Sequence, residues 1–131
     1  MSEVRVENNW VAQYLAGWAN QIAARYGHPV YLVGSALVEE KPRDVDIVVI
    51  LPDEEFTNRF GPWPETQMLG PIVTEGAKRW AAECGKLARW VTKYHPAVNV
   101  DFKVESDDWA ALKYTGKPKL RIDSVPFEKP P

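Results

Sequence analysis

Two short hydrophobic runs with a polar segment between them dominate the first half of the chain. Val30–Val33 is an apolar run of β-forming residues that ends at Gly34–Ser35. Ile47–Leu51 is a second such run, and Asp44–Asp46 opens it. Continuous apolar runs of this length, bounded by turn residues, are typical of buried strands. The pattern therefore predicts two buried strands and one helical turn, over Ala36–Glu40, in the polar segment between them.

Longer segments with apolar residues at three- and four-residue steps predict helices. Asn9–Tyr26 has one apolar stripe, Asn8 or Asn9 can cap its start, and Gly27 supplies a stop. Thr74–Tyr94 has the same spacing, so it is predicted to be a second long helix. Shorter helices are predicted over Asp53–Phe60 and from Ser106 to Tyr114, with a Gly- and Pro-rich loop over residues 61–71 between the long elements.

The segment Ala97–Val104 alternates between apolar and polar residues. Such alternation predicts a strand with one buried face, and it places Asn99, Asp101 and Lys103 together on the other face. A further short strand is expected within residues 117–125, and residues 126–131 are expected to form a loose tail. Strands that alternate with helices over this length predict one α/β (α+β) domain across residues 1–131.

Composition and charge narrow the range of functions. The chain has 131 residues and a formal net charge of −2, so it lacks the basic excess of proteins that bind nucleic acid nonspecifically. Cys84 is the single cysteine, and a chain that cannot form an internal disulfide fits a reducing, intracellular setting. The sequence shows neither a signal-peptide pattern nor a membrane-spanning apolar segment. We therefore expect a cytoplasmic protein that does not associate with membranes.

Two carboxylates lie at the start of the second predicted strand. Asp44 and Asp46 are two residues apart, so their side chains should project from one face, roughly 6–7 Å apart along the strand. Carboxylates side by side at the start of a buried strand are costly unless a positive charge lies between them. Magnesium prefers carboxylate oxygens, so the pattern predicts a divalent metal site for Mg²⁺, with Mn²⁺ as an alternative.

The order of these residues resembles a known signature. A hydrophobic strand, Gly34–Ser35, a short spacer, and Asp44-x-Asp46 in a second hydrophobic strand resemble the nucleotidyltransferase superfamily that includes DNA polymerase β. Its small members, the minimal nucleotidyltransferases, are about the size of this chain. The resemblance covers roughly Val11–Val104 in the order of elements. It implies the nucleotidyltransferase fold, a small mixed β-sheet flanked by helices.

The resemblance also implies a third carboxylate on a neighbouring strand, and Asp101 has that setting. Asp44, Asp46 and Asp101 would then be the catalytic residues and the metal ligands, holding two Mg²⁺ ions about 3.5–4 Å apart. The reaction implied is transfer of a nucleoside monophosphate from a nucleoside triphosphate to an acceptor hydroxyl, with release of pyrophosphate.

Phosphate binding is expected next to these carboxylates. A glycine lets the backbone approach a phosphate closely, and N–H groups of the following turn can bind phosphate oxygens together with a serine hydroxyl. Basic side chains nearby would balance the phosphate charge. The phosphate-binding residues expected on this basis are Gly34, Ser35, Arg43 and Lys103.

Several alternatives stay open. The acceptor could be a protein side chain, a small molecule such as an antibiotic, or an RNA end, and a partner protein or a homodimer could complete the site. The spacer Ala36–Arg43 is short for the family, and Ala36 and Leu37 stand where an arginine is often found. The main alternative is therefore a degenerate relative that binds a nucleotide or a partner protein without catalysis. Others are a metal-dependent phosphohydrolase, and aspartates that are merely solvent-facing, with Asp101 paired to Lys103.

Overall fold

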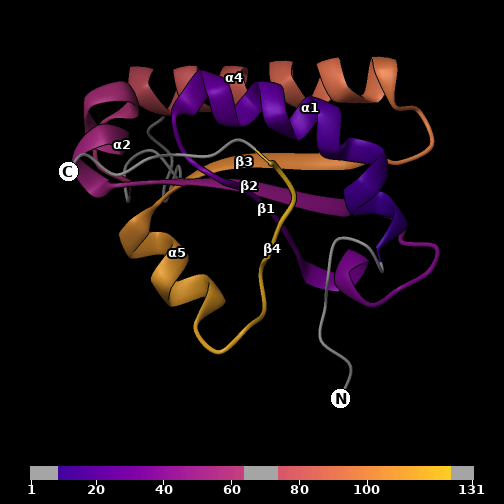
Figure 1. Ribbon diagram of the computed structural model, residues 1–131. Coiled ribbons are helices and arrows are strands. Elements are labelled where there is room, and N and C mark those ends of the chain that lie inside the picture. The colour runs from indigo at the N-terminus through magenta and orange to yellow at the C-terminus, as the bar shows by residue number, and fades with distance from the viewer. Residues whose placement is uncertain (1–8, 64–73, 125–131) are drawn as a thin grey trace.

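A four-stranded mixed sheet forms the centre of the computed structural model, which describes residues 9–63 and 74–124 (Figure 1). The strand order is β3-β2-β1-β4. β1 pairs antiparallel with β2 and with β4, whereas β2 and β3 are parallel. The strands are β1 (Val30–Val33), β2 (Val45–Leu51), β3 (Val100–Ser106) and β4 (Leu120–Arg121). The predicted fold class, an α/β (α+β) arrangement with a mixed sheet flanked by helices, is confirmed.

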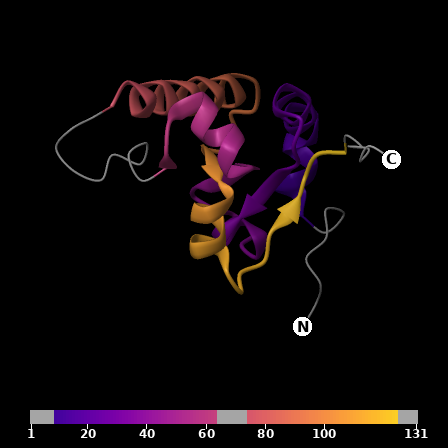
Figure 2. The same cartoon turned by 90° about the vertical axis from the view of Figure 1, so that its left-hand side faces the viewer.

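Helices cover both faces of this sheet (Figures 1 and 2). α1 (Trp10–Tyr26) and α4 (Glu75–Tyr94) lie on one face, with α2 (Asp53–Phe60) beside α4, and α5 (Asp107–Tyr114) lies on the other. The α1–α4 face holds most of the core, because every second residue of the central strands is apolar and buried there. The opposite face keeps the polar residues of β2 and β3.

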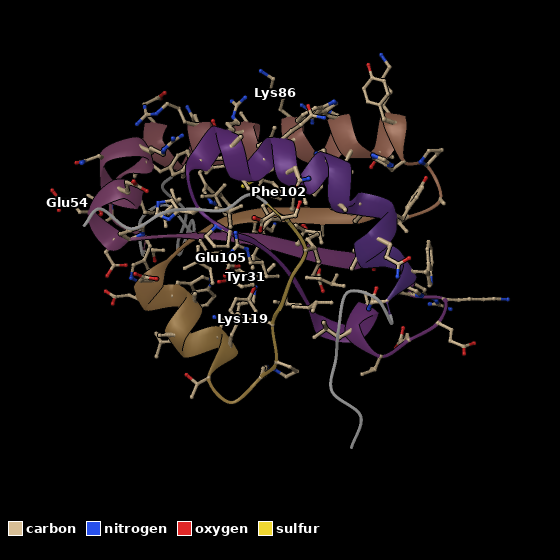
Figure 3. All side chains as sticks on the ribbon, in the orientation of Figure 1. Tyr31, Glu54, Lys86, Phe102, Glu105 and Lys119 are labelled. Atoms are coloured by element: carbon tan, nitrogen blue, oxygen red, sulfur yellow. The ribbon has the colours of Figure 1, made fainter. Side chains whose placement is uncertain are left out.

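Aromatic contacts join the two long helices to the sheet. The Trp18 ring meets the Phe102 ring edge-on at 5.7 Å between centroids, and the Trp80 indole Nε1 donates a hydrogen bond to the Val104 carbonyl at 2.7 Å. Figure 3 shows Phe102 in the layer between β3 and the helices, whereas Lys86 projects outward from α4. Both helices are therefore amphipathic with one buried stripe, as their apolar spacing predicted.

The helix ends also follow the sequence. The Asn9 side chain caps α1 by accepting a hydrogen bond from the Ala12 backbone N–H at 3.0 Å, and Gly27 ends the helix in a left-handed conformation with φ 71°. Thr74 and Ser106 cap α4 and α5 in the same way as Asn9 caps α1. The predicted short strand near the C-terminus is confirmed as β4.

The polar segment between β1 and β2 differs in detail from its prediction. Its helical turn is a 3-10 turn, η2 (Gly34–Leu37), which begins earlier than the predicted Ala36. Ala36 and Leu37 are buried in this turn, so it packs against the core. The Asn9 amide Nδ2 donates to the Ala36 carbonyl at 2.9 Å. The start of α1 therefore fixes the position of this turn.

The third strand also starts later than predicted, at Val100 instead of Ala97. After α4 the chain makes a turn, in which the Val98 N–H bonds to the His95 carbonyl at 3.4 Å. Pairing with β2 begins when the Asn99 carbonyl accepts the Val45 N–H at 2.9 Å. Val98 is buried as predicted, but as part of the turn.

Some predictions fall outside the described residues. These are the tail at 126–131 and most of the loop at 61–71, of which the structure describes residues 61–63. Within residues 9–63 and 74–124, no helix is both long enough and apolar enough to cross a lipid bilayer.

Two glycines of α4 provide a matched test of this packing. A Cβ at Gly76 would lie 1.7 Å from the Phe60 carbonyl oxygen, whereas a Cβ at Gly85 would meet only the flexible end of Arg89 at 3.1 Å. Gly76→Ala should lower the free energy of unfolding by about 2–4 kcal/mol, because helix backbone must move away from α2. Gly85→Ala should raise it by about 0.5–1 kcal/mol, because alanine favours the helix. Urea unfolding of both variants checks this; equal stabilities would contradict the α2–α4 contact.

Candidate functional site

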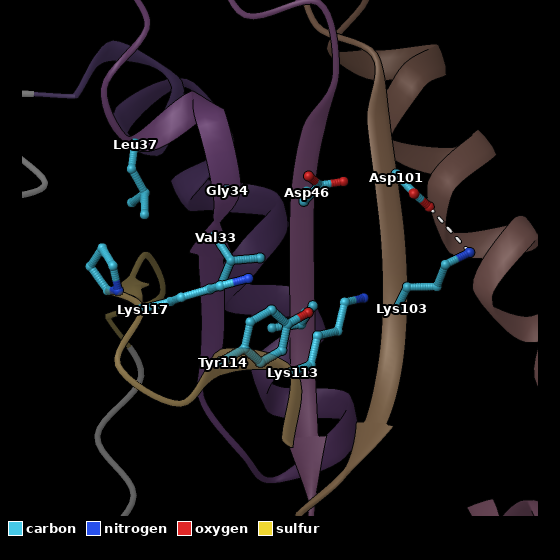
Figure 4. A pocket seen from close by; sticks show the side chains of 11 residues that line it. Val33, Gly34, Leu37, Asp46, Asp101, Lys103, Lys113, Tyr114 and Lys117 are labelled. Atoms are coloured by element: carbon cyan, nitrogen blue, oxygen red, sulfur yellow. Dashed lines mark ion pairs between the residues drawn. The ribbon is translucent and has the colours of Figure 1, made fainter. Parts of the chain in front are cut away.

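Asp46 and Asp101 lie side by side on the polar face of the sheet (Figure 4). They are register partners in the parallel pair of β2 and β3, and partners on neighbouring strands are about 4.8 Å apart in the backbone and share a face. The Asp101 side chain is 54% exposed, and Asp46 is half-buried. The two carboxylates that the sequence placed on separate strands are therefore brought together.

Asp44 lies just before β2, and its carboxylate is already engaged. Its Oδ1 accepts a hydrogen bond from the Asn99 amide Nδ2 at 2.8 Å, and both residues are exposed. Within residues 9–63 and 74–124, no three side chains of the types His, Cys, Asp and Glu are grouped closely enough to hold a metal ion. The structure thus provides a carboxylate pair, with Asp44 next to it and engaged through Oδ1 by the Asn99 amide.

The electrostatics of the pair favour a cation. Burial raises the pKa of the Asp46 carboxyl above its ordinary value, and the neighbouring Asp101 carboxylate raises it further, while the Lys113 ammonium opposes both effects. The Lys103 ammonium pairs with Asp101 Oδ1 at 3.3 Å and lies over the Trp80 ring. These oxygen-only ligands fit a hard divalent cation such as Mg²⁺ or Mn²⁺, which would relieve the repulsion between them.

The Gly34 backbone lies directly against the Asp46 carboxylate. Val33, the last residue of β1, is the register partner of Asp46, and the chain then turns at Gly34 with φ 78°. A Cβ at Gly34 would lie 2.9 Å from Asp46 Oδ2. A glycine is therefore required both by the conformation and by the close approach, and the turn starts at the carboxylate pair.

The carboxylate pair lies between two hollows in the surface. The first, here called the lysine cavity, has a volume of about 340 Å³ and lies between the sheet and the end of α5 (Figure 4). Its residues are Val33, Gly34, Leu37, Asp46, Val48, Asp101, Lys103, Lys113, Tyr114, Lys117 and Pro118. The second, here called the polar cavity, is lined by Ser35, Glu39, Arg43, Asp44, Asp46, Asn99, Val100 and Asp101.

The predicted phosphate-binding residues divide between these hollows. Gly34 and Lys103 line the lysine cavity, whereas Ser35 and Arg43 line the polar cavity and are exposed. The carboxylate pair borders both hollows, so all of the predicted site residues are within one continuous region of the surface. A cation at the carboxylates and an anion at the lysines could therefore be bound next to each other.

Sequence reasoning missed Lys113, Tyr114 and Lys117. They come from the end of α5 and the segment after it, and only the return of α5 across the polar face brings them to the carboxylates. Glu105 was missed as well, because the predicted strand ended at Val104. One local signal was present: Lys113 and Lys117 are four residues apart, directly downstream of the strand that carries Asp101.

We compared the chain with models of known protein families, with curated proteins and with solved structures, and none of them matches it. The chemistry of the carboxylate pair and its two cavities is therefore the basis for any functional assignment.

The raised pKa of Asp46 gives a prediction for the metal-free protein. Between its ordinary pKa, 3.8, and the raised value, the folded state binds more protons than the unfolded state, so stability falls as pH rises through that window. Asp46→Asn removes the carboxyl and therefore this pH-dependent loss of stability. At pH 7 in EDTA it should be more stable than the wild type by no more than about 1 kcal/mol, because solvent screens the partly exposed carboxyl. This limit corresponds to a rise in Tm of at most about 4 °C.

Thermal unfolding at pH 7 and at pH 3 checks this prediction. The difference between the wild type and Asp46→Asn should vanish at pH 3, where the Asp46 carboxyl is protonated in both states. Glu39→Gln is the matched control, because it removes an exposed carboxylate of the polar cavity that is not a register partner of Asp46 or Asp101. A destabilised Asp46→Asn at pH 7 would show that the carboxylate has a favourable partner in the free protein.

Proposed function

We propose that the protein is a metal-dependent nucleotidyltransferase, which moves a nucleoside monophosphate from a nucleoside triphosphate to an acceptor hydroxyl and releases pyrophosphate. The observation that carries the proposal is the register of β2 and β3, which sets Asp46 beside Asp101, together with the turn at Gly34 against Asp46. Paired carboxylates beside a phosphate-accessible turn suit two-metal phosphoryl transfer. The resemblance of Gly34–Ser35 and Asp44-x-Asp46 to the nucleotidyltransferase signature supports the same function.

Each residue then has a distinct role. Asp46 and Asp101 would hold Mg²⁺, or Mn²⁺ in its place, with Asp44 as a further ligand through Oδ2, the oxygen that the Asn99 amide does not engage. A bound Mg²⁺ supplies a Lewis acid that lowers the pKa of an attacking hydroxyl and neutralises phosphate charge. Asp101 Oδ2 is the carboxylate oxygen that Lys103 does not pair with, so it is placed to accept the proton of the acceptor hydroxyl.

The polar cavity suits the acceptor. It borders both carboxylates and is lined by hydrogen-bonding groups of Ser35, Arg43 and Asn99, which can orient a hydroxyl group. Ser35 and Arg43, predicted from the sequence to bind phosphate, are thus assigned to the acceptor in this proposal. A protein side chain, a small molecule or an RNA end would each present such a hydroxyl, and a partner protein or a second copy of the chain would cover the exposed side. We place this reaction in the cytoplasm, in keeping with the single cysteine.

A second candidate is a non-catalytic module of the same fold that binds a nucleotide or a partner protein. The geometry of the three carboxylates favours it, because within residues 9–63 and 74–124 they are not grouped closely enough to hold a metal ion. The two candidates differ in one respect: a catalyst needs the charge of Asp46 and Asp101 for turnover, whereas a binding module retains its ligand without it.

Isothermal titration calorimetry with each nucleoside triphosphate, with and without Mg²⁺, tests the proposal. We expect wild-type binding that depends on Mg²⁺, and Asp46→Asn should lose that dependence because the metal loses a ligand. Pyrophosphate release in the presence of an acceptor should fall by about 100-fold or more in Asp46→Asn and in Asp101→Asn, the loss typical of removing a transition-state charge interaction.

Glu54→Gln is the control, since Glu54 projects outward from α2, away from the site (Figure 3). Triphosphate binding that is independent of Mg²⁺ and survives Asp46→Asn would favour the binding module. Release of inorganic phosphate or nucleoside monophosphate without a labelled acceptor would indicate a phosphohydrolase. No binding of any triphosphate by the folded protein would contradict the proposed function.

A further inference from the structure

Two lysines that sequence reasoning missed line the lysine cavity. Figure 4 shows the Lys113 side chain crossing over β2 toward β3 and the Lys117 side chain ending beside Val33, with the Tyr114 ring between them. The carboxylate pair lies at one end of the same cavity. Cationic groups thus converge on a volume that adjoins the candidate metal ligands.

The Lys113 ammonium is held in place by a buried carboxylate. Glu105 is 1% exposed, and its Oε1 accepts hydrogen bonds from Lys113 Nζ at 3.3 Å and from the Tyr114 hydroxyl at 3.1 Å. A buried carboxylate is costly without a cation beside it, so Glu105 keeps Lys113 on the polar face of the sheet. An ammonium group has three N–H donors. The contact with Glu105 uses one donor, and the ammonium also lies over the Trp109 and Tyr114 rings, 6.0 and 5.4 Å from their centroids. The side chain is still 44% exposed, so a ligand in the cavity can reach the ammonium.

Lys117 and Lys103 differ in their availability. Lys117 is exposed at the rim of the cavity, and within residues 9–63 and 74–124 it forms no ion pair with a carboxylate. Lys103, in contrast, pairs with Asp101 and lies over Trp80. Lys117 is therefore the lysine of this cavity that has no carboxylate partner among the described residues, whereas Lys103 and Lys113 each share their charge with one.

The walls of the cavity strengthen such an interaction. Val33, Leu37, Val48 and Pro118 line it with apolar surface, and charged groups attract each other more strongly where the surroundings are less polar than water. The Gly34 backbone borders the cavity without a side chain. A volume of about 340 Å³ is at the lower end of the range for small-molecule sites, and it is large enough for a chain of phosphate groups.

We infer that the lysine cavity binds the polyphosphate part of the nucleotide, with Lys113 and Lys117 as its cationic ligands and Glu105 as the residue that positions Lys113. This inference rests on the proposed function and deepens it. The triphosphate lies on the α5 side of Asp46 and Asp101, and the acceptor approaches from the polar cavity on the other side. The pyrophosphate product would then leave through the rim at Lys117.

Calorimetric titration with inorganic tripolyphosphate in excess Mg²⁺ tests this inference without a nucleotide or an acceptor. Lys113→Gln and Lys117→Gln should each raise the Kd by about tenfold or more, the loss expected for one charge-assisted hydrogen bond. Lys119→Gln is the matched control. It removes the same charge from the same segment, but Lys119 lies over the Tyr31 ring, 5.1 Å from its centroid, and is not part of the lysine cavity (Figure 3). Its Kd should change by less than about twofold.

The outcomes separate the inference from the proposed function. An equal effect of Lys119→Gln would show that net charge alone attracts the anion, and it would overturn the inference. Unchanged affinity in Lys113→Gln and Lys117→Gln, or no binding of tripolyphosphate, would also overturn the inference. The proposed function would still stand if nucleoside triphosphate binding depended on Mg²⁺ and on Asp46. Lysine-dependent binding of tripolyphosphate without any nucleotidyl transfer would support the cavity and reject the enzyme. Because Lys117 does not contact Glu105, its variant remains informative even if Lys113→Gln loses stability.

Discussion

The parallel pairing of β2 with β3, with Asp46 opposite Asp101, is the constraint on which the polar face of the sheet depends. The buried face fixes this register, because Ile47 and Phe102 are partners there and both are almost fully buried. A slip of one residue would turn the whole apolar set of a strand toward solvent and its carboxylate into the core. The hydrophobic core under α1 and α4 thus holds two like charges together that would otherwise separate.

Neighbouring side chains balance the negative charge of the carboxylate pair. Lys103 pairs with Asp101, Lys113 lies near Asp46 and pairs with Glu105, and Asp44 accepts the Asn99 amide. Burial raises the pKa of both Asp46 and Glu105, so each carboxyl lowers the stability of the fold as pH rises from its ordinary pKa to its raised pKa. Carboxyls with raised pKa values are typical of functional sites. The hydrophobic core on the α1–α4 face offsets the stability that they cost.

The elements could be predicted from local pattern because each has a periodic signal and a chemical end, such as the Asn9 cap and Gly27 at the two ends of α1. The shared face of Asp101 and Lys103 followed from alternation alone. Local pattern did not predict the strand pairing. That the strand of Asp101 neighbours the strand of Asp46 was expected from the family resemblance alone and agrees with the sheet, whereas the register is decided by tertiary packing. Lys113 and Lys117 were hidden for the same reason: nothing in their local sequence says that α5 returns across the polar face instead of lying against α4.

The contacts of the free protein also bear on the order in which ligands would bind. Lys103 and Lys113 offset the negative charge of Asp101, Asp46 and Glu105, so the lysine cavity as a whole has little excess charge to attract a polyphosphate. On the proposed function, a divalent cation would neutralise Asp46 and Asp101, so the charge of Lys103 would no longer be offset by Asp101. Lys113 would keep its partner Glu105, and the cavity as a whole would gain net positive charge. Coulomb attraction for phosphate rises as a result. The cavity therefore favours a polyphosphate after, or together with, the metal, and disfavours it alone.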